Sequence, residues 1–261
     1  MTDKILTEQN GEIARIIFNQ PEKRNAVSLE MWEAVEAAVT RFEADNSVRI
    51  LILSGAGGKA FVSGADISKF ESERASAEAV AHYNATTKRV YDMVEAFPKP
   101  TIAQIDGFCV GGGVALALCC DLRICGEGSN FAVPAAKLGL GYGYPGLKRL
   151  VDVVGPAFAK EIFYTARRFN AEEARTMGLV NRVVPDAEVR QAVEDTAHMI
   201  AANAPMTIAS TKFIIGQTLL AESETDLAAC DARVKSCFDS QDYVEGRRAF
   251  LEKRKANFVG A

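Results

Sequence analysis

Three consecutive glycines, Gly111, Gly112 and Gly113, stand directly before an apolar run that ends at Asp121. The run predicts a short helix with the glycines at its start. A helix N-terminus offers backbone N–H groups without intrahelical partners, together with the positive end of the helix dipole. Such groups can stabilise an oxygen atom that gains negative charge in a transition state, such as an enolate oxygen. Glycines at a helix start can instead serve close packing alone, so the motif has two interpretations.

Two further segments have residue types suited to ligand contact. Residues 63–66 (Ser-Gly-Ala-Asp) follow a predicted strand, and their small side chains would let a ligand approach the backbone; an ordinary surface turn is the alternative. Residues 141–146 (Gly-Tyr-Gly-Tyr-Pro-Gly) match the spacing GxGxxG. A dinucleotide-binding loop follows an apolar strand directly, but no such strand leads into this segment and Pro145 interrupts it. We therefore do not expect a nicotinamide cofactor.

The elements that position these segments alternate between strand and helix in the first half of the chain. Continuous apolar runs predict buried strands, and apolar residues at helical spacing predict helices between them. Predicted strands cover residues 12–18, 50–55, 101–105 and 122–125, and predicted helices follow Ser28 and cover residues 77–97. This alternation implies right-handed crossovers and a layered α/β core. From residue 147 the pattern is mostly helical, apart from an extended return at residues 180–185.

Whole-chain properties narrow the possible functions. The chain has 261 residues and a net charge of −4, which disfavours a general nucleic-acid binder because such proteins need a basic surface. The longest apolar run, residues 108–120, is too short to cross a bilayer. Six cysteines without CxxC spacing suit free thiols in a reducing cytoplasm, and two distant histidines give no zinc-ligand pattern. We expect a cytoplasmic protein without a secretory signal, a bound metal, a membrane span or a nucleic-acid partner.

The sequence resembles the crotonase (enoyl-CoA hydratase/isomerase) superfamily along nearly its whole length. Residues 106–121 resemble the family's oxyanion-hole segment, and residues 61–66 its Phe-x-x-Gly-x-Asp signature. Residues 171–185 and 242–254 are similar to a structural segment and to the C-terminal helix of the family. The resemblance implies an α/β fold of the ClpP/crotonase type, a spiral of ββα repeats with a helical C-terminal trimerisation region. It also implies a crotonase-fold core at residues 1–195 and, at residues 196–261, a helical region that oligomerises and covers the coenzyme A site.

The resemblance further implies an acyl-CoA thioester substrate, with coenzyme A as part of the substrate and no permanently bound cofactor. By this resemblance the N–H groups of Ala65 and Gly112 donate to the thioester oxygen, and Tyr142 lies close to the reacting atoms. Tyr142 as a packing aromatic is the alternative. The implied coenzyme A contacts are Lys23, Arg24, Ala26, Ser63, Ala65, Asp66, Ile67 and Ser68, with Phe250 and Lys253 reaching the adenine end across a subunit boundary.

Lys23 and Arg24 are candidates for the phosphates of coenzyme A because charged donors bind phosphate oxygens strongly. Solvated surface charges are the alternative interpretation of both residues. Members of the family form trimers that often pair into hexamers. The resemblance therefore implies a homotrimer or a hexamer.

The chain departs from the hydratases of the family at both catalytic carboxylates. Ala115 stands where the first catalytic glutamate is found, and Ala135, after Pro134, stands at the second. General acid–base groups contribute about 10²–10⁴-fold each to a reaction, and alanine has no titratable atom. Hydration by the two-glutamate route is therefore expected to be largely lost. Decarboxylation of a β-carboxyacyl thioester or hydrolysis is preferred, since each depends mainly on an oxyanion hole.

Several alternatives remain open at the level of sequence. Glu71, Glu73 and His82 are candidate replacements for the missing acid–base groups, although solvated helix charges are the more frequent role of such residues. A true hydratase or isomerase with another acid–base group is one alternative function. A non-catalytic acyl-CoA-binding protein on the same scaffold is another, and turnover of any thioester would separate it from an enzyme. RNA binding is disfavoured by the acidic balance.

Overall fold

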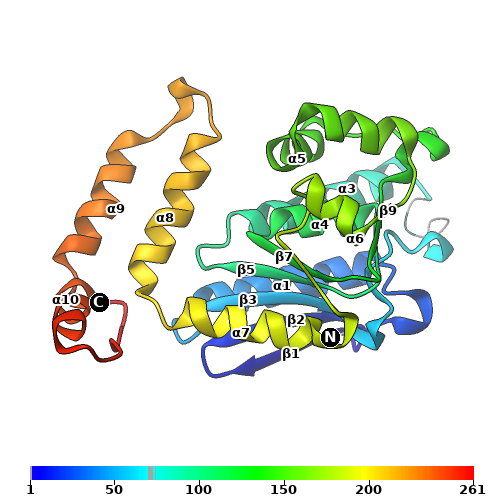
Figure 1. Cartoon of the computed structure of the whole chain (residues 1–261). Helices are drawn as coiled ribbons and strands as arrows, with labels where there is room; N and C mark the ends of the chain where they lie inside the picture. Colours follow the sequence, from blue (N-terminus) through cyan, green and yellow to red (C-terminus); the bar gives the residue numbers. More distant parts are fainter. Residues whose placement is uncertain (1, 70–72, 74) are drawn as a thin grey trace.

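The computed structural model describes residues 2–69, 73 and 75–261. A large sheet crosses the centre of the molecule (Figure 1) in the strand order β1-β2-β3-β5-β7-β10. β1 pairs antiparallel with β2, and all other neighbours in this sheet pair in parallel. The strands are β1 (Ile5–Asn10), β2 (Ile13–Phe18), β3 (Ile50–Gly55), β5 (Thr101–Ile105), β7 (Leu122–Gly126) and β10 (Arg182–Val184).

A smaller sheet has the strand order β4-β6-β8-β9. β4 pairs in parallel with β6 and β6 with β8, whereas β9 runs antiparallel to β8. These strands are short: β4 (Ala60–Val62), β6 (Phe108–Val110), β8 (Asn130–Ala132) and β9 (Phe169–Asn170).

The chain visits the two sheets in turn, and each visit ends in a helix. β3 is followed by β4 and α3 (Ala77–Glu95), β5 by β6 and α4 (Gly112–Cys119), and β7 by β8 and α5 (Tyr144–Thr165). Each unit adds one strand to the large sheet and one to the small sheet. This is the spiral of ββα repeats that the sequence predicts.

Helices cover both faces of the large sheet, which explains the continuous apolar strands. In β3, Leu51 and Leu53 join the core beneath α1 (Leu29–Ala44) and α3, while Ile50 and Ile52 pack against α7 (Val189–Ala201). A strand buried on both faces needs apolar residues at every position rather than at alternate positions. The predicted strand at residues 50–55 is therefore correct in position and in burial.

The chain ends in helices that stand apart from the sheets (Figure 1): α8 (Pro205–Thr218), α9 (Leu227–Asp239) and α10 (Gln241–Glu252). α8 is tied to the core by Lys212, whose Nζ donates to the Asp121 carboxylate at 2.8 Å and to the Lys99 carbonyl at 3.0 Å. The predicted domain boundary at residue 195 falls inside α7, which packs on the sheet. The division of the chain into two regions stays a prediction.

The predicted helix after Ser28 is confirmed as α1, but its first turn is capped by a residue distant in sequence. Ser28 occupies the N-cap position, but its hydroxyl makes no capping hydrogen bond. Instead Glu73 reaches this helix end, and its Oε1 accepts the N–H of Leu29 at 3.1 Å. A carboxylate at a helix N-terminus satisfies an unpaired donor and interacts favourably with the dipole. Glu73 therefore has a structural role here.

Candidate active site

Three parallel strands of the small sheet end side by side. Val62 pairs with Cys109 across β4 and β6, and Val110 pairs with Ala132 across β6 and β8. The segments that follow these strands are residues 63–66, 111–113 and 133–135. Because the carboxyl ends of parallel strands share one edge of a sheet, where ligands commonly bind, these segments lie beside one another. Residues 63–66 and residues 111–113, which the sequence marks as candidate ligand contacts, thus meet at one edge of the sheet together with Ala135.

The backbone at Ala65 is oriented by a bridge to the segment before α1. The N–H of Val27 donates to the Gly64 carbonyl at 2.8 Å, and the N–H of Asp66 donates to the Val27 carbonyl at 2.9 Å. Val27 and Ala65 thus form an isolated parallel bridge. Since the residues on either side of Ala65 make both bonds, the N–H of Ala65 itself points away from Val27. It is available as a donor on the other side of the segment.

The glycines before α4 form a tight turn into the helix. Gly111 has φ 54°, a left-handed value that favours glycine, and its N–H donates to the Ala132 carbonyl at 2.8 Å. Gly112 and Gly113 are the first residues of α4, so their N–H groups have no carbonyl one turn earlier in the helix. The predicted helix after the glycines is confirmed, with its free donors at the edge that carries Ala65.

Gly113 is required because α4 begins very close to β4. A Cβ atom at Gly113 would lie 2.1 Å from the Val62 carbonyl oxygen, far inside contact distance. This close approach brings the start of α4 against the strand that leads into residues 63–66. The close-packing interpretation of the glycines is therefore confirmed, and this packing also places the candidate donors. Their contact with a ligand oxygen stays a prediction.

The two alanine positions bring no titratable atom to this edge. Ala115 lies in the first turn of α4, and its carbonyl accepts a weak hydrogen bond from the Cys119 thiol at 3.2 Å. Ala135 is buried in the 3₁₀ turn at Pro134–Leu138 that follows β8. Burial raises the pKa of the Cys119 thiol well above its usual range, so this neighbour stays protonated. Neither alanine can serve as an acid or a base.

Tyr142 is partly buried and lies near Cys119, the last residue of α4. Its ring packs edge-to-face on Phe163, with ring centroids 4.8 Å apart, which supports the packing alternative. Burial, and to a smaller extent the Cys119 sulfur nearby, raises the pKa of the Tyr142 hydroxyl. In the part of the chain that the structure describes, this hydroxyl has no hydrogen-bond partner. Packing of the ring and a free hydroxyl are thus both present.

Tyr91 is a residue of this region that sequence reasoning missed. It lies on α3, and its hydroxyl donates to the Gly112 carbonyl at 3.2 Å. Trp32 of α1 packs edge-to-face on the Tyr91 ring at 5.4 Å between centroids. Its contact with Gly112 depends on how α3 lies against α4, which no local pattern around residue 91 indicates.

Four of the predicted coenzyme A contacts meet in one polar cluster. Lys23 Nζ donates to Asp66 Oδ2 at 2.8 Å and to Ser68 Oγ at 2.9 Å, and the Ser63 hydroxyl donates to the Lys23 carbonyl at 3.4 Å. Burial acts to raise the pKa of Asp66, but the hydrogen bonds from Lys23 and Ser68 outweigh it and hold this pKa below its usual value. Exposed Ile67 lies within this segment, and half-buried Ala26 precedes the bridge at Val27.

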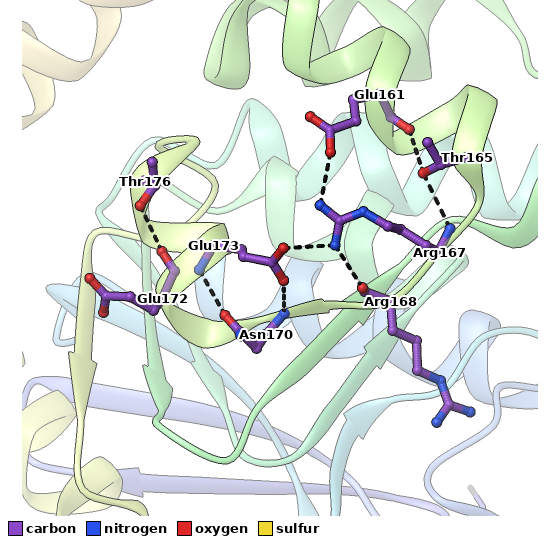
Figure 2. Close-up of polar contacts among 8 residues, drawn as sticks. All are labelled: Glu161, Thr165, Arg167, Arg168, Asn170, Glu172, Glu173 and Thr176. Atoms are coloured by element: carbon purple, nitrogen blue, oxygen red, sulfur yellow. Dashed lines mark hydrogen bonds and ion pairs between the residues drawn. The ribbon is translucent and has the colours of Figure 1, made fainter.

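Arg24 lies outside that cluster, over an aromatic ring. Its guanidinium carbon lies 4.8 Å from the centroid of Phe108, and that of Arg168 lies 5.4 Å from the same centroid. Figure 2 shows Arg168 directed away from the ion pairs that Arg167 makes with Glu161 at 2.8 Å and Glu173 at 2.7 Å. Among the described residues, Arg24 and Arg168 have no carboxylate within ion-pair distance. Arg168 is not predictable from the sequence, because only the fold brings it to Phe108.

The remaining predicted site residues are not brought to this region within one chain. Phe250 and Lys253 lie at the end of α10, which Figure 1 places on the opposite side of the molecule from α6 (Ala171–Thr176) and β9. Phe250 is 83% exposed. Their predicted contact with coenzyme A therefore requires a neighbouring subunit and stays a prediction.

Two of the candidate replacement acid–base groups, Glu73 and His82, contact α1 and not the edge that carries Ala65 and Gly112. Glu73 is engaged at the start of α1, and exposed His82 faces Glu33 of α1 at 3.5 Å. Glu71 lies outside the described residues. Within residues 2–69, 73 and 75–261, no cluster of three or more His, Cys, Asp or Glu side chains could hold a metal ion. In the same described part, no helix is long and apolar enough to cross a membrane.

The sequence and the fold both match known proteins. The family model described as "Enoyl-CoA hydratase/isomerase" matches residues 8–261. The chain is 36% identical over 257 residues to the crotonyl-CoA hydratase of Syntrophomonas wolfei, with 98% of each chain covered. It is 34% identical over 265 residues to the carnitinyl-CoA dehydratase of Salmonella typhi, with 100% of each covered. The solved structure of an enoyl-CoA hydratase from Bacillus anthracis superposes with a TM-score of 0.90 at 31% identity, covering 99% of this chain and 100% of that chain.

Proposed function

The chain belongs to the enoyl-CoA hydratase/isomerase family of the crotonase superfamily, and we propose that it stabilises a thioester enolate in a backbone oxyanion hole. It is an acyl-CoA enzyme with the α/β crotonase-like fold. The reaction we propose is decarboxylation or hydrolysis of an acyl-CoA rather than two-glutamate hydration. The observation that carries this proposal is the presence of N–H donors at the start of α4 beside Ala115 and Ala135, the two positions that the family resemblance assigns to catalytic carboxylates.

The proposed oxyanion hole consists of the N–H groups of Ala65 and Gly112. They belong to segments that follow adjacent strands, β4 and β6, and the close approach at Gly113 holds the two segments together. Backbone donors that are fixed before the reaction stabilise developing negative charge without reorganising. Losing one such donor costs about 2.7–4 kcal/mol in well-studied enzymes.

Decarboxylation suits this arrangement because it needs no base to begin. The bond between the α carbon and the carboxylate carbon of a β-carboxyacyl thioester breaks, and CO₂ leaves. The bonding electrons pass into the thioester, and the enolate oxygen accepts from both N–H groups. A proton from water then adds at the α carbon and gives the shortened acyl-CoA. Ala115 and Ala135 do not obstruct any of these steps.

Hydrolysis uses the same donors on a different intermediate. Water adds to the thioester carbonyl, and the tetrahedral oxyanion accepts from the N–H groups of Ala65 and Gly112. The intermediate then collapses with cleavage of the C–S bond. A proton from the attacking water passes through solvent to the sulfur, so that coenzyme A leaves as the thiol and the acyl group as the carboxylic acid. In this reaction the free hydroxyl of Tyr142 would orient the attacking water. Burial keeps this hydroxyl protonated, so it acts by hydrogen bonding and not as a base.

Coenzyme A would lie along the cluster of Lys23, Asp66 and Ser68. The charges of Arg24 and Arg168 are available for its phosphates, since neither side chain forms an ion pair among the described residues. Phe250 and Lys253 would complete the site from another subunit. The enzyme would need no permanently bound cofactor, because coenzyme A enters as part of the substrate.

The first experiment compares two substrates on the purified protein. Crotonyl-CoA hydration is followed as loss of enoyl-thioester absorbance, and decarboxylation of malonyl-type thioesters is followed as CO₂ release, with free thiol measured to detect hydrolysis. Calorimetric titration with crotonyl-CoA reports binding separately from turnover. We expect binding of crotonyl-CoA with little hydration, together with CO₂ or thiol release from another acyl-CoA. Brisk hydration would show that our preference is wrong.

True hydration is the second candidate because the relatives are named crotonyl-CoA hydratase and carnitinyl-CoA dehydratase. It requires an acid–base group other than the residues at positions 115 and 135. Binding without any turnover across the thioesters would instead favour an acyl-CoA-binding protein.

A further inference from the structure

Tyr91 is held in one place by residues of two neighbouring helices. The ring of Trp32 packs against it at an interplanar angle of 82°, and Trp32 is itself buried. The helix that carries Tyr91 is tied to α5 through its next residue, because Arg149 donates to the Asp92 carboxylate at 2.7 Å. Arg149 also contacts Glu95 at 2.6 Å. A side chain fixed at both ring and backbone can hold its hydroxyl at a defined point with little further loss of entropy.

That hydroxyl lies against the first residue of α4. It donates to the Gly112 carbonyl at 3.2 Å, and a Cβ atom on Gly112 would lie 3.2 Å from it. Residues 111–113 have no side chains to pack, so side-chain packing cannot restrict their rotation. The hydrogen bond from Tyr91 therefore adds a constraint at Gly112 to those that the Gly111–Ala132 hydrogen bond and the close approach of Gly113 to Val62 place on the neighbouring residues.

Burial, with a smaller contribution from nearby Tyr142, raises the pKa of Tyr91 well above its ordinary value. The phenol consequently stays protonated and remains a donor at neutral pH. A neutral donor also adds no charge beside the developing enolate.

We propose that Tyr91 is a positioning residue that fixes the start of α4 and so aims the Gly112 N–H at the thioester oxygen. This inference rests on the proposed function for its chemical consequence. Tyr91 acts through Gly112, and it need not touch the substrate. The competing role is simple filling of space by the ring, in which case the hydroxyl would be dispensable.

Tyr91→Phe separates the two roles, because it keeps the ring and removes the hydroxyl. Tyr83→Phe is the matched control: Tyr83 lies two turns earlier on α3, and its hydroxyl accepts a hydrogen bond from Trp32 Nε1 at 3.4 Å. We expect Tyr91→Phe to lower kcat about tenfold, which is the effect expected of one lost hydrogen bond, and to change KM less than twofold. Tyr83→Phe should leave the kcat of the folded enzyme within twofold.

Two measurements test whether the fall in kcat comes from a change in the position of the Gly112 N–H group. The carbonyl stretch of a bound, isotope-labelled acyl-CoA moves to lower frequency when the oxyanion hole polarises it, and this shift should shrink in Tyr91→Phe. Hydrogen exchange at residues 106–120, measured without ligand, should be faster in Tyr91→Phe than in Tyr83→Phe. A fully retained carbonyl shift and an unchanged kcat in Tyr91→Phe would overturn the positioning role alone. Absence of any carbonyl shift in the unmodified protein would overturn the proposed oxyanion hole itself.

Discussion

At the scale of single residues, the proposed chemistry depends on main-chain groups that most substitutions leave in place. Proline is the exception, because it lacks the N–H and is tolerated at the first position of a helix. Gly112 is that first position in α4. We predict that Gly112→Pro lowers kcat for the thioester substrate about 10²–10³-fold, as expected for one lost oxyanion donor.

Gly112→Ala is the control for this prediction. It retains the N–H but adds a Cβ atom 3.2 Å from the Tyr91 hydroxyl, so it carries the steric change alone. Steady-state kinetics of both variants, with acyl-CoA binding measured by calorimetry, separate the two effects. Equal losses of kcat in the two variants would mean that the N–H of Gly112 is not a catalytic donor.

Asp66 provides a prediction about pH. Its pKa is held below the usual value by Lys23 and Ser68 against the opposing effect of burial. A carboxylate with a lowered pKa in the folded state adds stability that is fully present above the pKa of the unfolded chain, about 3.9, and is lost as the pH falls through the folded value. We predict that Asp66→Asn lowers Tm by a constant amount between about pH 5 and 8, and that the difference shrinks below about pH 4.

Thermal unfolding of Asp66→Asn and the unmodified protein across this pH range tests the prediction. Asp239→Asn is the control, since its ion pair with Lys235 is exposed and such surface pairs contribute little. A Tm difference that persists unchanged at pH 3 would refute the assignment of the effect to the Asp66 charge.

The sequence could predict the residues whose chemistry is local, but not those whose role comes from the fold. The family resemblance assigns Ala115 and Ala135 to the carboxylate positions through their distance from the glycines and from Pro134, and this assignment stays a prediction. The position of the glycines before a helix predicts the N–H groups at its start, and the structure has the helix there. Tyr91 and Arg168 could not be predicted, because each meets its partner through packing between elements that are distant in sequence.

At the scale of elements, the contact between β4 and α4 determines where the donors lie. The Val62 carbonyl occupies the space that a Cβ atom of Gly113 would need, at 2.1 Å. We predict that Gly113→Ala forces the helix away from the strand and lowers the free energy of unfolding by about 3 kcal/mol, near the upper end of typical overpacking costs. Activity should fall with it, because the helix carries Gly112.

Urea denaturation measures this loss, and α8 offers a matched glycine. Gly216 lies inside a helix, and a Cβ atom added there would have no neighbouring atom within 4 Å among the described residues. Gly216→Ala should therefore raise the free energy of unfolding by about 0.5–1 kcal/mol, as helix propensity alone requires. If Gly113→Ala were no less stable than the unmodified protein, the close approach would not be a constraint on the fold.

The longer elements of the core were predictable, and the shortest strands were not. β3 begins with a continuous apolar run, β5 is mostly apolar, and α1 and α3 have apolar residues at helical spacing, so each shows a recognisable pattern in the sequence. β6 and β8 have only three residues each, which is too few to show an alternation. These strands exist because each pairs with neighbours in the small sheet, and that pairing is a property of the whole spiral.

At the scale of the whole molecule, the C-terminal helices carry large apolar side chains that a single chain leaves exposed to solvent. Large apolar side chains are exposed on each of them, among them Ile215 at 58% on α8, Leu227 at 69% on α9 and Leu251 at 80% on α10. Large apolar side chains exposed on several helices of one region indicate an interaction site. We therefore propose that these helices join copies of the chain, in agreement with the predicted trimer or hexamer.

This proposal gives the final prediction, which concerns Leu251→Glu. Because Leu251 is mostly exposed in one chain, the substitution costs an isolated chain little, but it would place an unpaired charge inside an interface. We expect sedimentation to show a trimer or hexamer for the unmodified protein and smaller species for Leu251→Glu. Tyr164→Glu is the control, since Tyr164 is 76% exposed but lies on α5, outside the C-terminal helices. If Leu251→Glu assembled normally, Leu251 would lie outside the interface. If the variant dissociated and still bound coenzyme A with full affinity, the predicted contribution of Phe250 and Lys253 across the subunit boundary would be wrong.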